Sequence, residues 1–463
     1  MLLNKEKTYF FCGIGGSGML PLAMIMQGQG YKIAGSDRGR DQGRTPEKFA
    51  FLETQGMALH QQDGSGITAD TVLVVSTAVE NTIPDVQQAK ALGCTSIKRA
   101  ELLAQLFNDA DSRIAIAGTS GKSTTTGMVG YALHTLGKNP TVMNGAVFKN
   151  FQTTENPYST ALSGDDKLFI IEADESDGSI ELYNPTIAVL NNITLDHKSL
   201  DELDVLFTRF LNGASAAVLN LDDPAVAKLA GKANNAITYG IHNKSADIVA
   251  SNINGEPFSI QADITFKGGE THRLSLHVPG QHNLQNALAA LSTLITMGVP
   301  AADACQALSG FTGVKRRMDV VGEKSGVTVI DDFGHNPDKI SATLKTLKEF
   351  KGRLLVVFQM HGFGPLKLMY NDLMDSFTQH MEADDVLYMP EVLYLGGTAD
   401  QSVNAKGFIG DIQKKGLKAH WFEKRDAIEA AITAEAKSGD RIVIMGARDD
   451  TLSDFAKNIL LKL

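Results

Sequence analysis

Residues 113–123 have the pattern of a phosphate-binding loop. A short apolar run leads into a glycine turn, and Lys122 and Ser123 then open a segment with helical spacing of apolar residues. Such a strand–turn–helix places backbone N–H groups, an ammonium group and a hydroxyl where triphosphate oxygens and Mg²⁺ would lie. Ile116 stands where the usual motif has its first glycine, so the loop is a shortened variant. A glycine turn without a ligand is the alternative, and the polar run 124–126 argues against it.

A second glycine-rich turn follows the apolar residues 8–12. Gly13, Gly15 and Gly18 have the spacing of a dinucleotide-binding fingerprint, and Asp37 follows the next apolar run. The pattern favours a nucleotide diphosphate at the N-terminus of the following helix and does not require a nicotinamide. Glycines that serve only strand–helix packing are the alternative. The same glycines interrupt an uncharged stretch that superficially resembles a signal peptide or a membrane span, so we expect a strand–turn–helix instead.

Polar residues follow two further apolar runs. Glu172 comes directly after residues 168–171. A carboxylate at the end of a strand beside the phosphate-binding loop is well placed to share a Mg²⁺ ion with Ser123. A solvated acidic loop is the alternative, and no role is predicted for the three acidic residues that come next. His197 follows another apolar run, where it either binds a second divalent cation or caps a loop.

Amide and basic side chains mark three more segments. Asn283 and Asn286 lie on one face of a predicted helix, where they either read a purine edge or cap the helix. The basic run 315–317 could reach a transferring phosphoryl group or simply face solvent. Residues 331–337 follow an apolar run, at the edge where α/β proteins bind ligands. The sequence therefore indicates phosphoryl transfer by positioning, two metal ions and cations, without a covalent enzyme intermediate.

Length and composition restrict the class of protein. The 463 residues suffice for about three domains. A hydrophobic fraction of 43% and a charged fraction of 21% are typical of a soluble globular protein. The net charge of −10 argues against nucleic-acid binding. The three widely separated cysteines favour a reduced, cytoplasmic location.

Apolar runs alternate with helical segments almost throughout, which predicts an α/β fold with mainly parallel sheets in three domains. The first, residues 1–108, is expected to be Rossmann-like and to end in a polar linker at 108–112. The second, residues 109–312, carries the phosphate-binding loop and a stretch at 247–278 that alternates like antiparallel sheet. The third, residues 313–463, is expected to be a smaller doubly wound domain.

In order and spacing, these motifs resemble those of the Mur ligases, the ATP-dependent amide-forming enzymes of bacterial peptidoglycan synthesis. The matching segments are residues 13–19, 118–126, 172–178, 192–197, 278–290, 313–318 and 331–337. The resemblance implies an N-terminal UDP-binding domain, a central P-loop ATPase and a C-terminal Rossmann-like domain for the amine. It also implies the reaction. ATP phosphorylates the carboxylate of UDP-N-acetylmuramate, an amine attacks the acyl phosphate, and phosphate leaves.

The resemblance also implies roles for particular residues. Catalytic roles are expected of Lys122, Glu172, His197 and Arg317. Ser123 and Glu172 would hold one Mg²⁺ ion, and His197 the other. ATP contacts are expected from Gly118, Thr119, Ser120, Gly121, Lys122, Ser123, Thr124, Asn283, Asn286, Arg317, Asp332 and His335. Contacts with the UDP-sugar are expected from Gly15, Gly16, Ser17, Gly18, Met19, Asp37 and Ser76. The amine substrate, an amino acid or short peptide, would meet His361, Lys367 and Arg448. A monomer or homodimer without nucleic-acid or membrane partners is expected.

The chain departs from the family pattern at several positions. Ser120 and Asn336 replace histidines, and Asn212 stands where several members carry a carbamylated lysine. Residues 360–365 lack the two arginines with which the alanine-adding branch holds its amino acid. Each lost charge-assisted bond is worth roughly 1.5–3 kcal/mol. Either Lys367 or Arg448 compensates, or the amine is not alanine.

Three alternatives to alanine addition stay open. Within the family, the rival is the branch that joins a recycled murein peptide to the same sugar nucleotide. From another class, an NAD-dependent dehydrogenase would explain the first glycine turn and Asp37 but leaves Lys122, Ser123 and Glu172 without a purpose. A non-catalytic binding or regulatory protein that keeps the ATP site is the third.

Overall fold

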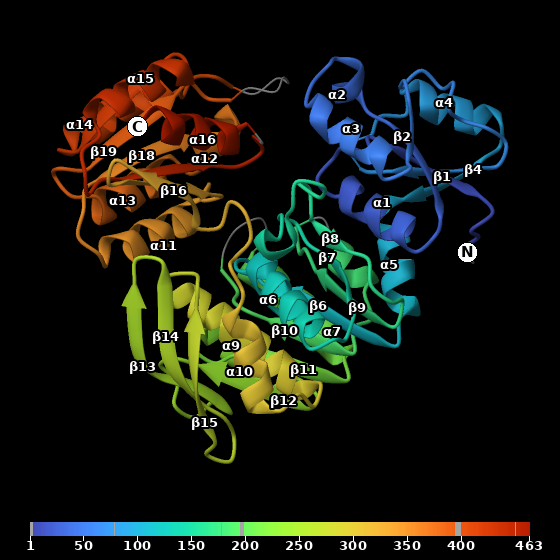
Figure 1. Cartoon of the computed structure of the whole chain (residues 1–463), viewed down its shortest axis with the longest axis horizontal. Helices are drawn as coiled ribbons and strands as arrows, with labels where there is room; N and C mark the ends of the chain where they lie inside the picture. Colours follow the sequence, from blue (N-terminus) through green and yellow to red (C-terminus); the bar gives the residue numbers. More distant parts are fainter. Residues whose placement is uncertain (1–2, 78, 177, 195–198, 394–399, 450) are drawn as a thin grey trace. The chain divides into compact units, whose positions relative to one another are not determined.

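The computed structural model describes residues 3–77, 79–176, 178–194, 199–393, 400–449 and 451–463. These residues form two compact units (Figure 1). The first unit comprises Met1–Ile253, Gln261–Leu276 and Asn283–Thr312, and the second comprises Asn254–Ile260, His277–His282 and Gly313–Leu463. Within the described ranges, no helix has the length and apolar character needed to cross a membrane.

The first unit begins with a five-stranded parallel sheet in the order β3-β2-β1-β4-β5. Its strands and helices are β1 (Thr8–Cys12), α1 (Met19–Gly28), β2 (Lys32–Ser36), α2 (Arg38–Asp41), α3 (Pro46–Thr54), β3 (Ala58–His60), β4 (Thr71–Val75), α4 (Pro84–Ala91), β5 (Thr95–Lys98) and α5 (Arg99–Asp109). Successive side chains of a strand point to opposite faces. Tyr9 and Phe11 therefore pack in one core with α1 and α5, whereas Phe10 packs in another with α4. Both faces of β1 are buried, which explains its uncharged run, and the predicted strand–turn–helix is confirmed.

The rest of the first unit is built on a ten-stranded sheet in the order β15-β14-β13-β12-β11-β10-β6-β9-β7-β8. Its strands are β6 (Ser112–Ala117), β7 (Thr141–Met143), β8 (Ala161–Leu162), β9 (Leu168–Glu172), β10 (Ile187–Leu190), β11 (Ala216–Asn220), β12 (Ala236–Gly240), β13 (Ile248–Glu256), β14 (Ser259–Thr265) and β15 (Thr271–Leu276). Its helices are α6 (Lys122–Thr135), η1 (Lys149–Phe151), η2 (Ser179–Leu182), α7 (Leu200–Asn212), α8 (Pro224–Leu229), η3 (Ala230–Lys232), α9 (Gln281–Thr296) and α10 (Ala301–Ser309). Strand β6 lies between β9 and β10 and is parallel to both. The carboxyl ends of these three strands therefore meet at one edge, where α/β proteins bind ligands.

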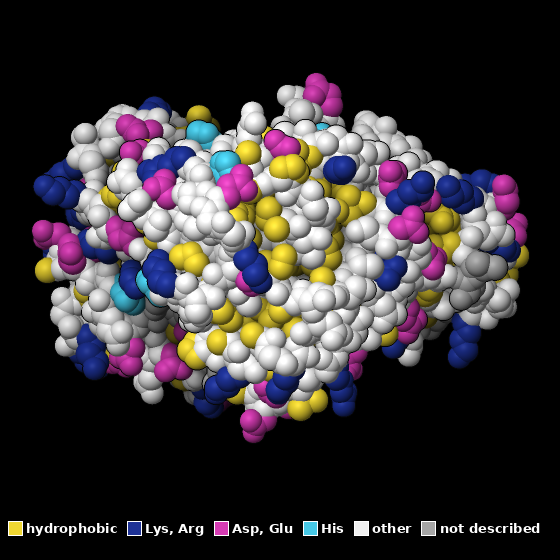
Figure 2. Space-filling view, turned by 90° about the horizontal axis from the view of Figure 1, so that it is seen from below, with side chains coloured by type: hydrophobic (Ala, Val, Ile, Leu, Met, Phe, Trp, Pro, Cys, Tyr) yellow, Lys and Arg dark blue, Asp and Glu magenta, His cyan; other side chains and the backbone are white. Residues whose placement is uncertain are grey.

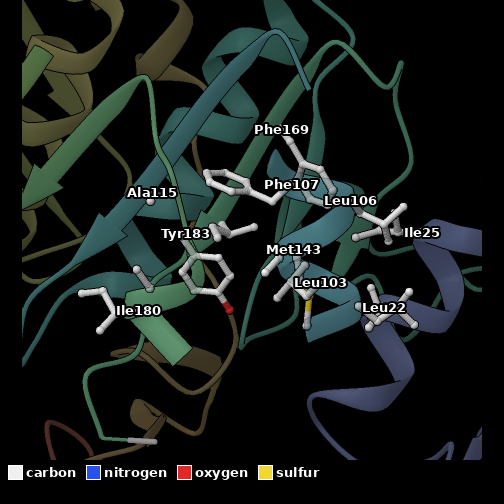
Figure 3. Close-up of a cluster of buried hydrophobic side chains, with 14 of the residues drawn as sticks. Leu22, Ile25, Leu103, Leu106, Phe107, Ala115, Met143, Phe169, Ile180 and Tyr183 are labelled. Carbon is white, nitrogen blue, oxygen red and sulfur yellow. The ribbon is translucent and has the colours of Figure 1, made fainter. Parts of the chain in front are cut away.

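The two sheets of the first unit share an apolar core through α5 (Figure 3). The Phe107 ring of α5 lies edge-on to Phe169 of β9 and to Tyr183, with ring centroids 5.9 and 5.6 Å apart. The same cluster contains Leu22, Ile25, Leu103, Leu106, Ala115, Met143 and Ile180. One continuous core therefore joins the N-terminal helices to the central sheet.

The second unit contains a six-stranded sheet in the order β16-β17-β21-β18-β19-β20, in which only the edge strand β16 is antiparallel. The elements are β16 (Asp319–Lys324), β17 (Val327–Asp332), α11 (Pro337–Lys348), β18 (Leu354–Gln359), α12 (Phe363–Leu368), α13 (Tyr370–His380), β19 (Val386–Pro390), α14 (Ala405–Lys414), β20 (Lys418–Phe422), α15 (Arg425–Glu435), β21 (Arg441–Gly446) and α16 (Leu452–Lys462). Val356 of β18 packs with α11, α13 and α14, whereas Val357 packs with α15 and α16. Helices thus cover both faces, as a doubly wound domain requires.

The predicted α/β fold with mainly parallel sheets is confirmed. The stretch predicted as antiparallel sheet forms the consecutive edge strands β13, β14 and β15. The linker predicted at 108–112 is shorter than expected, because α5 continues to Asp109 and β6 begins at Ser112. Buried Ala110 holds this connection against the shared core. The boundaries expected at 108/109 and 312/313 stay predictions.

Candidate functional site

The phosphate-binding loop joins β6 to α6 and is held by residues that follow β10. Gly118 and Gly121 have φ angles of +124° and +84°, which glycine adopts without steric cost. The side-chain oxygen of Asn192 accepts a hydrogen bond from the Ser120 amide at 2.8 Å, and its nitrogen donates to the Ser120 carbonyl at 3.0 Å. The Thr119 amide donates to the Asn192 carbonyl at 3.2 Å. Asn192 therefore clamps the loop, a role that the sequence analysis did not predict.

This clamp changes which loop amides face outward. The amides of Thr119 and Ser120 are bound to Asn192, and the contacts with ATP expected from these two residues stay predictions. The first helical bond of α6 runs from the Thr125 amide to the Gly121 carbonyl at 2.9 Å. The amides of residues 122–124 precede that bond, and such amides at a helix N-terminus are the donors that bind anions.

Lys122 is the first residue of α6, and its ammonium group has two partners. It donates to the Gly118 carbonyl at 2.7 Å and forms an ion pair with Glu175 at 2.9 Å. Glu175 lies in the connection that follows β9 and is 5% exposed. Sequence reasoning assigned no role to Glu175. The available signal was its place among acidic residues directly after a strand that neighbours β6.

Ser123 and Glu172 lie together, as the sequence analysis predicts for a shared magnesium ion. The Ser123 hydroxyl donates to Glu172 Oε2 at 3.0 Å, and the Gly145 amide donates to Oε1. Hydroxyl and carboxylate oxygens suit Mg²⁺, which takes one or two carboxylates, substrate phosphates and water. In the ranges that the structure describes, no three His, Cys, Asp or Glu side chains form a metal cluster. The pair fits an ion held jointly with phosphate. His197, the third expected metal ligand, lies outside the described residues.

A chain of buried hydrogen bonds supports α6 from α9 and β12. The Thr125 hydroxyl accepts from the Asn191 side chain at 2.9 Å and donates to Asn286 at 3.3 Å. Asn286 donates to Asn283 at 3.4 Å, and the Tyr239 hydroxyl donates to Asn191 at 3.3 Å. Asn283 and Asn286 are 3% and 7% exposed. These two amides therefore hold the phosphate-binding helix, and their expected contact with adenine stays a prediction.

We expect Gly121→Ala to destroy nucleotide binding. A Cβ at Gly121 would lie 2.3 Å from Asn286 Oδ1 and 3.0 Å from Asn191 Nδ2, at a φ of +84°. Both amides are fixed in the buried chain, so strain of about 1–3 kcal/mol is expected. Thermal unfolding measures the loss of stability, and titration with ATP measures the loss of nucleotide binding. Gly137→Ala is the matched control, since its φ is +71° and its Cβ would meet nothing within 4 Å. Unchanged ATP affinity in Gly121→Ala would contradict this expectation.

The N-terminal glycine loop between β1 and α1 is fixed by Asp37. This carboxylate accepts from the Gly15 amide at 2.9 Å and from the Gly39 amide at 2.7 Å, and so caps α2. The Met19 amide donates to the Gly16 carbonyl at 3.0 Å, and Met19 is buried. Asp37 and Met19 are therefore engaged within the loop, and their expected contacts with the UDP-sugar stay predictions.

Two expected UDP-binding residues immediately precede α1, beside a basic side chain. Ser17 and Gly18 lie just before the first residue of α1. The nearest side-chain atom of Arg99, at the start of α5, lies 3.2 Å from the position that a Cβ at Gly18 would take. Ser76 directly follows β4, at the same edge of the parallel sheet. A guanidinium group beside a helix N-terminus favours an anion such as a diphosphate.

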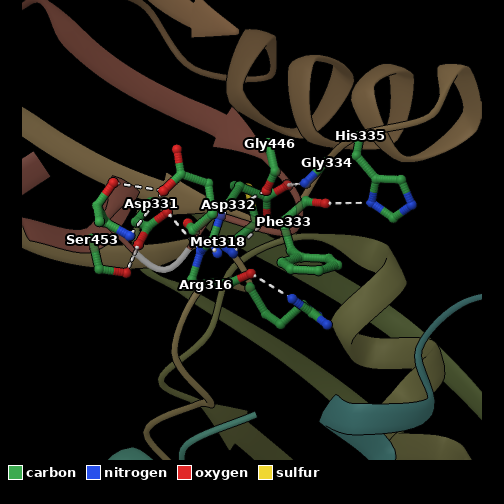
Figure 4. A network of polar contacts seen from close by, with 12 residues as sticks. Arg316, Met318, Asp331, Asp332, Phe333, Gly334, His335, Gly446 and Ser453 are labelled. Carbon is green, nitrogen blue, oxygen red and sulfur yellow. Dashed lines mark hydrogen bonds and ion pairs between the residues drawn. The ribbon is translucent and has the colours of Figure 1, made fainter. Parts of the chain in front are cut away.

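In the second unit, a polar network fixes the carboxyl end of β17 (Figure 4). Arg316 donates to the carbonyls of Gly446 and Asp449 at 2.6 and 3.1 Å and pairs with Asp331 at 3.4 Å. Ser453 donates to the other Asp331 oxygen at 2.6 Å. Burial raises the pKa of Asp331, and Arg316 opposes that rise. Arg316 therefore ties β17 to the segment that follows β21.

Asp332, expected to contact nucleotide, is directed into the protein. It accepts from the Gly334 amide at 2.8 Å, the Thr343 hydroxyl at 2.9 Å and the Met318 amide at 2.8 Å. It is 6% exposed. Asn336 stands where the family pattern has a histidine. Its side chain caps α11, so it has a local structural role. The expected contact of Asp332 with nucleotide stays a prediction.

Arg317 and His335 lie against Phe333, and His361 lies against His335. The Arg317 guanidinium lies 4.4 Å from the Phe333 ring centroid, and the two histidine rings are 5.4 Å apart. The His335 Nδ1 lies 2.9 Å from the Phe333 carbonyl. Because a carbonyl only accepts, Nδ1 carries the proton and Nε2 is left as an acceptor. Burial, with the charges of neighbouring basic groups, lowers the pKa of His335 to about 3, so the ring is neutral at pH 7.

The three residues expected to meet the amine separate into two environments. His361 is partly buried, and burial together with the charge of nearby Arg448 lowers its pKa. Within the described part of the chain, its buried Nδ1 has no hydrogen-bond partner. Lys367 of α12 instead forms an exposed ion pair with Asp400 at 2.6 Å. His361 and Arg448 thus share one site, whereas Lys367 lies in a surface pair.

One face of the molecule carries basic and acidic side chains intermingled with small apolar patches (Figure 2). Alternation of both signs on a surface keeps the local potential low, whereas nucleic-acid binding requires a concentrated positive field. The net charge of −10 argues against a nucleic-acid partner, and the absence of such a partner stays a prediction.

The parallel sheets, together with a glycine loop that leads into a lysine and a serine beside a carboxylate, define a P-loop type of α/β protein. Comparison with known proteins gives the family. Three family models match: the Mur ligase family catalytic domain over residues 8–110, the Mur ligase middle domain over 116–294, and the Mur ligase glutamate ligase domain over 316–448. The chain belongs to the Mur ligase family. Members of this family are ATP-dependent ligases that form amide bonds.

Similar proteins cover the whole chain. It is 33% identical to a UDP-N-acetylmuramate–L-alanine ligase of Pelobacter propionicus, over 96% of each chain. It superposes on the crystal structure of UDP-N-acetylmuramate–alanine ligase MurC from Thermotoga maritima with a TM-score of 0.81 and 23% identity, over 98% of this chain and 99% of that one. A murein peptide ligase from Psychrobacter arcticus gives a TM-score of 0.71 and 23% identity, over 98% of both chains.

Proposed function

We propose that this chain joins the carboxylate of UDP-N-acetylmuramate to the amino group of L-alanine, at the expense of ATP. The observation that carries the proposal is the 33% identity to a ligase of that name over 96% of both chains. The loop residues Lys122 and Ser123, next to Glu172 and Glu175, support the same conclusion, because phosphoryl transfer needs cations and a metal-binding carboxylate beside the phosphates.

The proposed reaction has two steps. A carboxylate oxygen of UDP-N-acetylmuramate attacks the γ-phosphorus of ATP, and ADP leaves. The amine then attacks the acyl phosphate, and phosphate leaves from the tetrahedral intermediate as the amide forms. The first step is needed because a carboxylate becomes a good electrophile only when its oxygen becomes a good leaving group. Residues 1–108 would hold the UDP-sugar, residues 109–312 ATP, and residues 313–463 the amine.

Particular side chains take the proposed roles. Lys122 and the amides of residues 122–124 bind the β- and γ-phosphates. Ser123 and Glu172 would hold one Mg²⁺ ion and His197 a second, and these ions would supply positive charge to the phosphates. Arg317 neutralises charge on the transferring γ-phosphoryl group. His361 and Arg448 meet the amine substrate. We expect a cytoplasmic monomer or homodimer.

A murein peptide is the second candidate for the amine substrate, and the end of β18 favours it. Between Gly362 and Pro365 the chain has no arginine. A Cβ at Gly364 would meet nothing within 4 Å, so there is open space beside this segment. Leu368 on the adjoining α12 is 84% exposed. Open space and an exposed apolar side chain suit a larger amine than alanine.

Phosphate release with UDP-N-acetylmuramate, Mg–ATP and single amines tests the proposal. L-Alanine should give the highest kcat/KM among amino acids, with an amide product confirmed by mass spectrometry. A higher kcat/KM for a murein tripeptide would select the second candidate. Binding of both nucleotides without phosphate release for any amine would indicate a non-catalytic protein. Binding of NADH, followed by fluorescence, would favour a dehydrogenase and contradict both ligase assignments.

We expect Arg317→Ala to lower kcat by about 10²–10³-fold while the affinity for ATP changes less than about tenfold. The guanidinium lies over the Phe333 ring, 4.4 Å from its centroid, and donates to the Arg316 carbonyl at 2.9 Å. Arg316→Ala is the contrast, because Arg316 bonds to the Gly446 carbonyl and Asp331 and its loss should lower the melting temperature. Kinetics and thermal unfolding of both variants separate the two roles. Equal losses of kcat and ATP affinity in Arg317→Ala would argue against transition-state stabilisation.

A further inference from the structure

Both functional side chains at the start of α6 face carboxylates, one at the end of β9 and one in the connection that follows it. The Ser123 hydroxyl donates to Glu172 at 3.0 Å, and the Lys122 ammonium pairs with Glu175 at 2.9 Å. The side chains of Lys122 and Glu175 are 15% and 6% exposed, so water screens this ion pair weakly. The lysine that would meet phosphate is therefore already compensated by a buried carboxylate.

The local charge follows from these contacts. Lys122 contributes one positive charge and Glu172 and Glu175 two negative charges, so the three side chains together carry −1. A metal-free triphosphate would meet a lysine whose charge is cancelled and two carboxylates that repel it. A triphosphate that carries a divalent cation brings positive charge to the same carboxylates. Repulsion of the metal-free triphosphate and attraction of the metal-bound one would let the site discriminate between the two forms.

We propose that Glu175 is a positioning residue that makes the loop select the magnesium complex of ATP against metal-free ATP. Glu175 holds the Lys122 ammonium against the Gly118 carbonyl, 2.7 Å away, and cancels its attraction for bare phosphate. The inference rests on the proposed ATP site. It adds the form of the nucleotide that the site accepts, and it assigns that selectivity to a residue outside the metal and phosphate contacts.

The test is equilibrium binding of the non-hydrolysable analogue β,γ-imido-ATP to the whole chain, by calorimetry, in Mg²⁺ and in EDTA. Glu175→Gln keeps a hydrogen-bond acceptor for Lys122 and removes the charge. We expect it to bind the metal-free analogue at least about tenfold more tightly than the parent chain, with the affinity for the magnesium complex changed less than about threefold. The preference for the magnesium form would then fall by a similar factor.

Two further variants separate charge from structure. Glu181→Gln removes a carboxylate from η2 in the same connection, where Glu181 pairs with exposed Arg209 at 3.2 Å, and should leave the preference unchanged. Glu175→Asp keeps the charge on a shorter side chain and should retain the preference. If Glu175→Gln fails to fold, Glu175→Asp still tests the proposal, since a lost preference there would overturn it.

The outcomes also distinguish this proposal from the proposed function. If Glu175→Gln binds metal-free analogue no more tightly than the parent chain, or loses both affinities in parallel, Glu175 has only a structural role and the proposal fails by itself. If the parent chain does not bind the analogue even with Mg²⁺, the ATP site and this proposal fail together.

Discussion

Replacing Lys122 with alanine is expected to abolish phosphate release with UDP-N-acetylmuramate and any amine. The ammonium group lies at the start of α6, where it bonds to the Gly118 carbonyl and to Glu175. Its loss removes the cation proposed to meet the β- and γ-phosphates and leaves the negative charge of Glu175. We expect kcat to fall by at least about 10³-fold, measured as phosphate release under saturating Mg–ATP.

A double variant shows whether this loss is chemical or structural. Lys122→Ala leaves a carboxylate that is 5% exposed without its ion-pair partner. Breaking a buried ion pair on one side costs about 3–5 kcal/mol, so the single variant should also melt at a lower temperature. Adding Glu175→Gln should recover most of that stability and none of the activity. Full activity of Lys122→Ala would show that the phosphate-binding site has been wrongly assigned.

The second large effect is expected for Glu172→Ala, which should raise the magnesium requirement. Glu172 receives the Ser123 hydroxyl at 3.0 Å and also accepts from the Gly145 amide. Of the two described side chains expected to hold the ion, only the Ser123 hydroxyl would then be left. The half-saturating Mg²⁺ concentration for phosphate release should rise at least about tenfold.

Asp174→Asn is the matched control for Glu172→Ala. It removes a carboxylate two residues further along the same connection, where Asp174 accepts from the Ser176 amide at 2.9 Å. Its magnesium titration should match that of the parent chain. A Glu172→Ala enzyme with the parent's magnesium titration would exclude this carboxylate as a metal ligand.

Local sequence patterns were enough to predict most strands and the phosphate-binding loop. Strands β6, β9 and β10 are short apolar runs bounded by polar residues, and the apolar spacing after Lys122 fits one helix. Ser123 and Glu172 were placed together correctly, because the carboxyl ends of neighbouring parallel strands share an edge. The comparisons confirm the family that the ordered motifs indicated.

Contacts between distant segments were harder to predict. Asn192 is 72 residues from Ser120 along the chain, yet it bonds to both backbone groups of that residue. Asn192 follows β10, which neighbours β6, so the sequence indicated only that Asn192 lies at the same edge of the sheet as the loop. The same holds for Glu175, since three acidic residues follow Glu172 and only the fold determines which one reaches Lys122.

Residues with two plausible roles were the hardest to interpret from sequence. Asp37 and Asp332 match the positions of ligand-binding residues, yet both carboxylates accept hydrogen bonds from nearby backbone amides. A short acidic side chain after a strand can bind a ligand or cap a turn, and sequence alone does not separate these roles. Lys367 differs again, because Asp400 pairs with it on the surface.

The shared core around α5 limits how this chain could exchange parts with its relatives. Phe107 packs against Phe169 and Tyr183, which both lie beyond the expected boundary at 108/109. A chimaera joined there would set side chains from two lineages against each other, and each buried methylene lost would cost about 1 kcal/mol. Evolution of residues 1–108 is thereby tied to that of the residues that follow, so substitutions at Phe107 and Phe169 should arise together.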